Sequence, residues 1–178
     1  KIAKKYQVLS GHPQKQKIIV GGDRYHGCTF GSMSLGSRGP HFAWDDYGPL
    51  LPGVVQIPGV PVFDEDGQHD PGADNRVAEE LERVILAEGP DTVACFLDVT
   101  IATAGSTHPS PQYWPRVREI CDKYGVLIAV DEIMMGMGRT GKWFGFEHWE
   151  GFVPDIVMIA KSLTNGAVPL GATIVTNE

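Results

Sequence analysis

Two charged residues lie where apolar segments of the chain end. Asp131 comes directly after the apolar run Val126–Val130, and Lys161 comes directly after the run Ile156–Ala160. Their separation is 161 − 131 = 30 residues, about one crossover unit between neighbouring parallel strands. Since the carboxyl ends of parallel strands meet at one edge of a sheet, we expect both side chains to face one cleft. Taken singly, each charge is equally well explained as the point where a buried strand meets water.

A lysine and a carboxylate that face one cleft have a specific chemistry. An amine that is partly desolvated at the wall of a cleft loses affinity for its proton and can form a Schiff base with a carbonyl. A carboxylate nearby can keep a heteroaromatic nitrogen protonated. Lys161 and Asp131 therefore meet the requirement of a pyridoxal phosphate (PLP) site, in which the protonated ring accepts the electrons released at the α-carbon of the substrate.

Two further segments fit a flat ring held between this pair. Tyr25-His26-Gly27 follows the β-branched run Lys17–Val20 through a Gly-Gly loop, so an aromatic face can be presented at the same edge of the sheet. Ile133 lies two residues beyond Asp131, and in an extended chain it points to the same side, where it can cover the opposite face of the ring. For Tyr25 the alternative is that the ring packs under a loop, as aromatic side chains often do.

The segments that position these residues alternate between strand and helix patterns. The predicted strands are Lys17–Val20, Val54–Ile57, Thr92–Leu97, Val126–Val130, Ile156–Ala160 and Ala172–Val175. The predicted helices run over Lys1–Leu9, from a cap at Asp74 or Asn75 to Gly89, and from Pro111 or Pro115 to Gly125. This alternation predicts an α/β fold, a three-layer αβα domain with a mainly parallel sheet. The first helix lacks a capping residue, so we expect the chain to begin inside something larger.

Composition and charge argue against several classes of function. The 178 residues are 42% hydrophobic and 21% charged, which is typical of a globular domain. The formal net charge of −7 repels polyanions, so no nucleic acid partner is expected. No apolar run approaches the roughly 18–20 residues that span a bilayer, so no membrane partner is expected, and no histidine spacing predicts a metal. The odd, widely spaced Cys28, Cys95 and Cys121 are typical of free thiols in the cytoplasm.

A glycine-rich segment matches two nucleotide-binding patterns only in part. Gly136–Gly141 has the spacing G-x-G-x-x-G, and Gly136–Lys142 matches the start of the P-loop pattern. The P-loop needs a Ser or Thr next to ligate magnesium, and this chain has Trp143 there. The dinucleotide pattern needs a tight turn directly after a strand, yet Asp131–Met135 intervene. A nucleotide-binding α/β domain is therefore the weakest interpretation.

Around these residues the sequence resembles the class III PLP-dependent aminotransferases, the group of the ornithine, 4-aminobutyrate and omega-amino-acid enzymes. The similarity runs in register through Val130–Gly141, Phe144, Glu147, Pro154–Ile156 and Ala160–Gly166, and upstream through Tyr25–Thr29 and Leu50–Val54. It covers essentially the whole chain. The resemblance implies the large domain of a fold-type-I PLP enzyme, of which residues 1–178 are a part, with the small domain and the other flank outside.

The resemblance also implies roles for individual residues. It implies that Lys161 forms the Schiff base with the cofactor and shuttles the proton, and that Asp131 pairs with the ring nitrogen. Tyr25 would stack on one face of the ring and Ile133 would cover the other, with His26 among the residues that bind the cofactor. In the family the active site forms between two subunits, so a homodimer is implied for the full-length protein.

Two positions depart from the family pattern. Where the family usually has Glu-Pro-Val before a Gly-rich stretch, this chain has Asp98-Val99-Thr100 and then residues 102–105. We include Asp98 among the candidate cofactor-binding residues. Met134 stands where some members have a Gln near the ring hydroxyl, which favours the pyruvate-linked omega-aminotransferases over the ornithine and 4-aminobutyrate branches.

The sequence thus predicts a transaminase that moves an amino group from an amine or amino acid to a 2-oxo acid, with pyruvate as the expected acceptor. A PLP-dependent aminomutase or decarboxylase would share the proton-handling residues. The alternative from another class is a non-catalytic fragment. By the resemblance, the residues that bind the cofactor phosphate and the substrate carboxylate lie outside the chain, so we expect residues 1–178 alone to be inactive.

Overall fold

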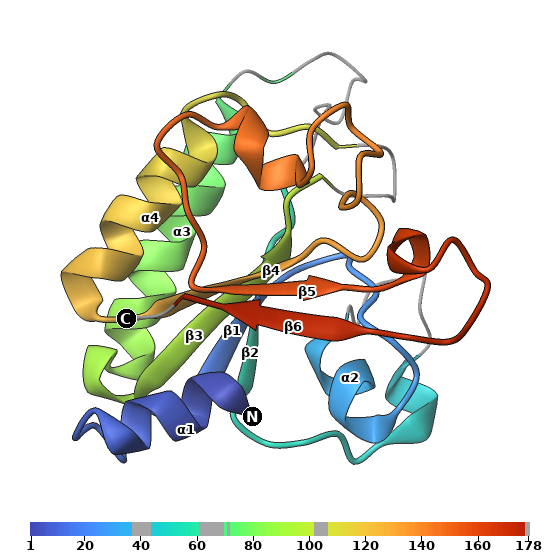
Figure 1. The fold of residues 1–178 in the computed structure, drawn as a ribbon. Coiled ribbons are helices and arrows are strands. Elements are labelled where there is room, and N and C mark those ends of the chain that lie inside the picture. The colour runs from blue at the N-terminus through green and yellow to red at the C-terminus, as the bar shows by residue number, and fades with distance from the viewer. Residues whose placement is uncertain (37–43, 61–69, 71, 102–106, 177–178) are drawn as a thin grey trace.

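A six-stranded sheet forms the centre of the structure (Figure 1). The computed structural model describes residues 1–36, 44–60, 70, 72–101 and 107–176. The strand order is β2-β1-β3-β4-β5-β6. The strands are β1 (Lys17–Gly21), β2 (Val54–Ile57), β3 (Val93–Val99), β4 (Leu127–Asp131), β5 (Ile156–Ile159) and β6 (Ala172–Val175).

The sheet is parallel from β2 to β5, and β6 pairs antiparallel with β5. The predicted mainly parallel sheet is therefore confirmed. β4 and β5 are direct neighbours, with Asp131 in register with Met158, so the expected meeting of their carboxyl ends is also confirmed. β3 runs two residues further than the predicted Thr92–Leu97 and takes Asp98 into the strand.

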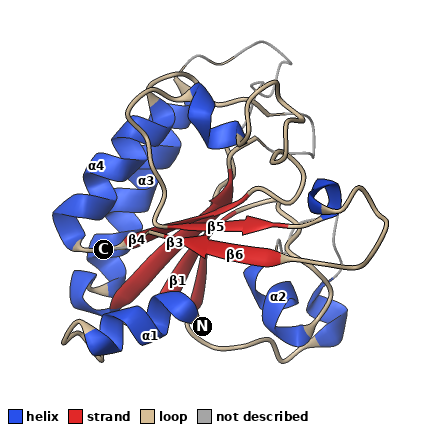
Figure 2. Cartoon of the chain, in the orientation of Figure 1, coloured by secondary structure: helices blue, strands red, loops and turns tan. Residues whose placement is uncertain are grey.

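Helices cover both faces of the sheet and make three layers (Figure 2). α3 (Ala73–Glu88) and α4 (Tyr113–Tyr124) pack on one face, and α1 (Ile2–Leu9) and α2 (Phe30–Leu35) lie on the other. Successive strand residues enter the two cores alternately. Phe96 belongs to the core under α3 and α4, whereas Leu97 belongs to the core on the side of α1. This two-sided burial explains why the strands read as continuous apolar runs.

The ends of the two long helices agree with the sequence at their C-termini and differ at their N-termini. α3 ends before Gly89 at φ 88° and α4 before Gly125 at φ 61°, both in the region that glycine adopts readily. The predicted cap at Asp74 or Asn75 is wrong, because Gly72 holds that position. Asp74 lies in the first turn, and its carboxylate accepts the N–H of Ser110 at 2.7 Å, which ties α3 to the start of α4.

The start of α4 and the whole of α2 also differ from the prediction. α4 begins at Tyr113 after Gln112, so neither Pro111 nor Pro115 is its first residue. α2 was not predicted at all. Among the described residues, short 3-10 turns lie at Trp44–Tyr47, Pro90–Thr92, Gly145–His148 and Lys161–Leu163. Within the described ranges, no helix has the length and apolar character needed to cross a membrane.

Candidate active site

A cavity of about 280 Å³ opens at the carboxyl edge of the sheet. Its walls come from the loop after β1, the end of β3, and the segments that follow β4 and β5. The lining residues are Asp23, Arg24, Tyr25, His26, Gly27, Val99, Ile101, Asp131, Ile133, Met134 and Lys161. The structure therefore places Asp131 and Lys161 on one cavity, as their positions after two apolar runs predicted.

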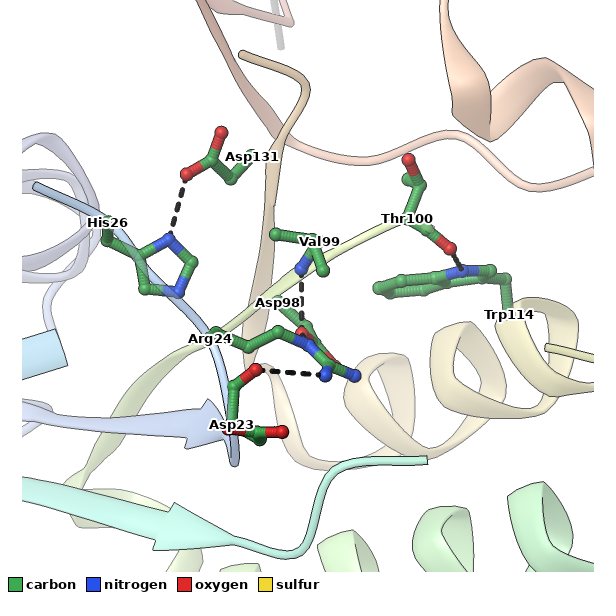
Figure 3. A network of polar contacts seen from close by, with 8 residues as sticks. All are labelled: Asp23, Arg24, His26, Asp98, Val99, Thr100, Trp114 and Asp131. Carbon is green, nitrogen blue, oxygen red and sulfur yellow. Dashed lines mark hydrogen bonds and ion pairs between the residues drawn. The ribbon is translucent and has the colours of Figure 1, made fainter. Parts of the chain in front are cut away.

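Asp131 is buried at the end of β4 and is held by two hydrogen bonds. Its Oδ1 accepts the N–H of Ile133 at 2.9 Å, and its Oδ2 lies 2.8 Å from Nδ1 of His26 (Figure 3). The two side chains of the His26–Asp131 pair are only 4% and 7% exposed. Because a carboxylate can only accept, Nδ1 of His26 carries the proton of this bond. Among the described residues Nε2 of the same ring has no hydrogen-bond partner.

Lys161 stands at the rim of the cavity in an unusual backbone conformation. It follows β5 and Ala160, and it has a φ of 44°, in the left-handed region that residues other than glycine rarely adopt. Such conformations concentrate at functional sites. Its Nζ lies beside the sulfur of Met134. The sequence predicted a partly desolvated amine, but Lys161 is exposed at the edge of the cavity that it lines.

Tyr25 and Ile133 lie on the cavity wall with different degrees of burial. Tyr25 is 48% exposed, and Ile133 is half-buried. Both line the same cavity as Asp131, which agrees with the geometry that the sequence analysis expected of them. Val99 and Ile101 add further apolar surface from the end of β3. The contacts that Tyr25, His26, Asp131 and Ile133 would make with a ring stay predictions.

Asp98 lies on the other side of the sheet. In the register of β3 with β4, Val99 is opposite Asp131, whereas Asp98 is opposite Val130. Since successive strand residues point to opposite faces, Asp98 faces the α4 layer while Val99 faces the cavity. The carboxylate of Asp98 is 2% exposed and lies 2.7 Å from Nε of Arg24. Asp98, a candidate cofactor-binding residue from the sequence, therefore lies behind the cavity wall and not on it.

Arg24 is a buried residue of the site that the sequence analysis missed. It is 6% exposed, lines the cavity, and pairs with Asp98 on the face opposite to Asp131. Burial lowers the pKa of the guanidinium, but the Asp98 carboxylate opposes and outweighs this, so the net direction of the pKa is upward. Nothing in the sequence pairs these two residues, because 74 positions separate them.

Glu132 is a second buried charge that the sequence analysis did not single out. Its carboxylate accepts the hydroxyl of Thr100 at 2.7 Å and the N–H groups of Gly145 at 2.8 Å and Phe146 at 3.0 Å. Burial raises its pKa, and these three hydrogen bonds act in the opposite direction. Glu132 thereby ties the segment that follows Asp131 to the end of β3 and to the turn at Gly145–His148.

The glycine-rich segment is closed by its own backbone. The N–H of Gly136 donates to the carbonyl of Glu132 at 2.8 Å, and the N–H of Met137 donates to the carbonyl of Trp143 at 2.7 Å. These N–H groups are therefore not free to cradle a phosphate. In the part of the chain that the structure describes, no group of three or more His, Cys, Asp or Glu side chains is arranged to hold a metal ion.

Comparison with known proteins identifies the family. The family model for class III aminotransferases matches residues 1–178. The chain belongs to the class III aminotransferase family. The match includes the loop after β1 and the segments after β4 and β5, which together build the cavity.

Individual members of this family resemble the chain over its whole length. A putrescine–pyruvate aminotransferase of Pseudomonas aeruginosa is 37% identical, and the match covers 100% of this chain and 39% of that protein. A taurine–pyruvate aminotransferase of Bilophila wadsworthia is 35% identical, with 100% and 39% covered. The structure of a PLP-bound amine transaminase from an uncultivated Pseudomonas species has a TM-score of 0.90 at 32% identity, covering 99% of this chain and 40% of that one. The chain thus spans about two fifths of the length of these relatives.

Proposed function

We propose that this chain is the PLP-binding part of a transaminase that moves an amino group from an amine or amino acid to a 2-oxo acid. In this proposal residues 1–178 belong to the large domain of the enzyme. The observation that carries it is the cavity that Asp131 and Lys161 share, with Asp131 buried and held by His26. Pyruvate is the proposed acceptor, because the names of the putrescine–pyruvate and taurine–pyruvate aminotransferases described above include it.

The residues of the cavity fit a pyridine ring. The buried carboxylate of Asp131 can only accept hydrogen bonds while ionised, so it matches a ring nitrogen that carries a proton. Apolar side chains of Val99, Ile101 and Ile133 line the cavity beside it. A volume of about 280 Å³ is close to the lower end of ligand cavities, roughly 300 Å³, which suits one small ring.

When bound, PLP supplies an aldehyde that reacts with primary amines and a ring that accepts the electron pair released at the α-carbon. Lys161 would provide the amine at the cavity rim and would carry the proton that leaves the substrate α-carbon to the cofactor. Asp131 would keep the proton on the ring nitrogen, with its orientation fixed by His26. Tyr25 and Ile133 would flank the ring from the cavity wall.

The proposal is tested by locating the reactive amine in the full-length protein. Borohydride reduction in the presence of PLP, followed by peptide mapping, should place the label on Lys161. Lys161→Ala should abolish both the label and amino transfer. Lys142→Ala is the matched control, since Lys142 is exposed, donates to the carbonyl of Glu147 and does not line the cavity. A label on another lysine, or no label, would refute the assignment.

Product analysis separates transamination from other reactions of the same cofactor. With an amine donor, product should form only when pyruvate or another 2-oxo acid is present. Turnover of the donor without any acceptor would identify an aminomutase or a decarboxylase instead. A full-length protein that binds PLP and turns over no donor would support a non-catalytic role.

Assembly and location are part of the same proposal. The proposed enzyme is a homodimer in the cytoplasm. All three cysteines, Cys28, Cys95 and Cys121, are free thiols, which suits a reducing compartment. Light scattering of the full-length protein tests the assembly, and a monomeric mass at working concentration would contradict it.

A further inference from the structure

We propose that Arg24 and Asp98 are positioning residues: their buried ion pair, on the face of the sheet opposite to Asp131, anchors the loop 23–27 so that His26 meets Asp131. The loop geometry is a property of the chain itself, and its consequence for cofactor binding rests on the proposed function. Neither residue of the pair touches the reacting atoms in this proposal. They act through His26 and Asp131.

Arg24 and Asp98 form a buried and closely held ion pair. The side chains of Arg24 and Asp98 are 6% and 2% exposed. Oδ1 of Asp98 accepts Nε–H of Arg24 and the N–H of Val99, both at 2.7 Å, so the carboxylate is fixed to the backbone of its own strand (Figure 3). A buried charge that loses its partner is costly, so this pair holds its two segments together firmly.

Two glycines, Gly21 and Gly59, leave the space that the pair occupies. A Cβ on Gly21, the last residue of β1, would lie 2.4 Å from Cγ of Asp98. A Cβ on Gly59 would lie 3.2 Å from Nη1 of Arg24 and 2.5 Å from the carbonyl oxygen of Gly22. The two charged side chains therefore fill a closely packed niche, which is built from the ends of β1, β2 and β3.

The loop 23–27 connects this ion pair with His26. After β1 the chain turns at Asp23, with a φ of 55°, and residues 23–27 then run along the cavity wall. Arg24 is held on the α4 side by Asp98, and His26 reaches the cavity side, where its Nδ1 lies 2.8 Å from Asp131 (Figure 3). Because only Tyr25 separates them, a shift of Arg24 is transmitted to His26. The anchor therefore sets whether the His26–Asp131 bond forms.

The experiment reads the His26–Asp131 bond directly in the full-length protein without PLP. A histidine N–H that donates to a buried carboxylate gives a strongly downfield proton signal, which His26→Gln assigns by its loss. Arg24→Met and Asp98→Asn should abolish or broaden this signal. The double variant R24M/D98N leaves no buried charge alone, so it should fold and still lack the signal. Circular dichroism and the melting temperature report whether each variant folds.

A second charge pair provides the matched control. Nη1 of Arg118 lies 2.8 Å from Oδ2 of Asp155, which also accepts the N–H of Ile128, just as Asp98 accepts that of Val99. Arg118 lies in α4, and Asp155 directly precedes β5, at the opposite end of that strand from Lys161. Arg118→Met should leave the downfield signal intact.

A titration with PLP gives the second readout. The Kd should rise about tenfold in R24M/D98N and stay unchanged in Arg118→Met, because a hydrogen bond to a charged group contributes about that factor. Persistence of the His26 signal in folded R24M/D98N, its absence from the wild type, or its loss in Arg118→Met would overturn the proposal. A wild type that shows the signal and binds no PLP would refute the proposed function while leaving the anchor in place.

Discussion

Replacing Gly21 by Ala tests how tightly Gly21 packs against the carboxylate of Asp98, on the face of the sheet opposite to the cavity. A Cβ at this position would lie 2.4 Å from both Cγ and Oδ2 of Asp98. Non-bonded carbon atoms prefer a separation of about 3.5–4.0 Å, so the carboxylate must move by about 1 Å to admit the methyl group. The backbone of β1 is held on both sides by β2 and β3 and cannot supply this movement.

The carboxylate of Asp98 also has little freedom. Its Oδ1 is held at 2.7 Å by Nε of Arg24 and at 2.7 Å by the N–H of Val99, so a shift of about 1 Å breaks at least one of these bonds. Overpacking costs about 1–3 kcal/mol, and loss of a hydrogen bond to a charged group costs about 1.5–3 kcal/mol. We therefore expect Gly21→Ala to lower the free energy of unfolding by about 3–5 kcal/mol.

Urea unfolding of the full-length protein, followed by tryptophan fluorescence, measures this loss. Gly31→Ala is the matched control. The nearest atom to a Cβ on Gly31 is Cδ1 of Leu51 at 4.0 Å, and Gly31 lies in α2, where Ala is favoured over Gly by about 1 kcal/mol. The control should be neutral or more stable than the wild type.

A double variant isolates the contact between the added methyl group and the carboxylate of Asp98. In an Asp98→Ala background the carboxylate is gone, so the methyl group of Gly21→Ala has room and should add less than about 0.5 kcal/mol. Two results would refute the reasoning. One is that Gly21→Ala unfolds like Gly31→Ala, and the other is that it costs as much in the Asp98→Ala background as in the wild type.

Two further predictions concern buried titratable groups. Burial raises the pKa of Glu132 above its ordinary 4.5, so ionisation of this carboxyl disfavours the folded state. As the pH rises from 4.5, the melting temperature of Glu132→Gln should therefore increase relative to that of the wild type. A difference in melting temperature that stays constant with pH would contradict this. Burial also raises the pKa of Cys95 to about 12 and that of Cys121 in the same direction, so neither thiol should react with a maleimide at neutral pH before unfolding, as mass spectrometry of the native protein would show.

The sequence was sufficient for the parts of the fold that depend on local patterns. Strands buried on both faces appear as unbroken apolar runs, and the ends of α3 and α4 are marked by Gly89 and Gly125 with positive φ. α2 gave no such signal, because it has six residues and its capping box uses Ser32 in place of the usual Glu or Gln. The sequence patterns therefore predicted the longer helices α1, α3 and α4 and missed the short helix α2.

The candidate site was predictable where its residues follow a strand directly. Asp131 and Lys161 mark the ends of two apolar runs, and the structure puts them on one cavity. Arg24 was not predictable, since its role depends on a partner 74 positions away. Asp98 was named from its position in the family pattern, which does not show the direction of the side chain; the strand that continues to Val99 fixes the face on which Asp98 lies.

The roles of Asp98 and Asp131, which lie on neighbouring strands, thus depend on the face of the sheet to which each side chain points. Val99 and Asp131 are register partners and face the cavity, whereas Asp98 and Val130 are partners and face α4. A glutamate at position 98 would have the same direction and would still point away from the cavity, into the niche beside Gly21. A segment that crosses the sheet edge can connect a carboxylate on that face with the site. The loop after β1 is such a segment, since Arg24 meets Asp98 behind the sheet and His26 meets Asp131 in front of it.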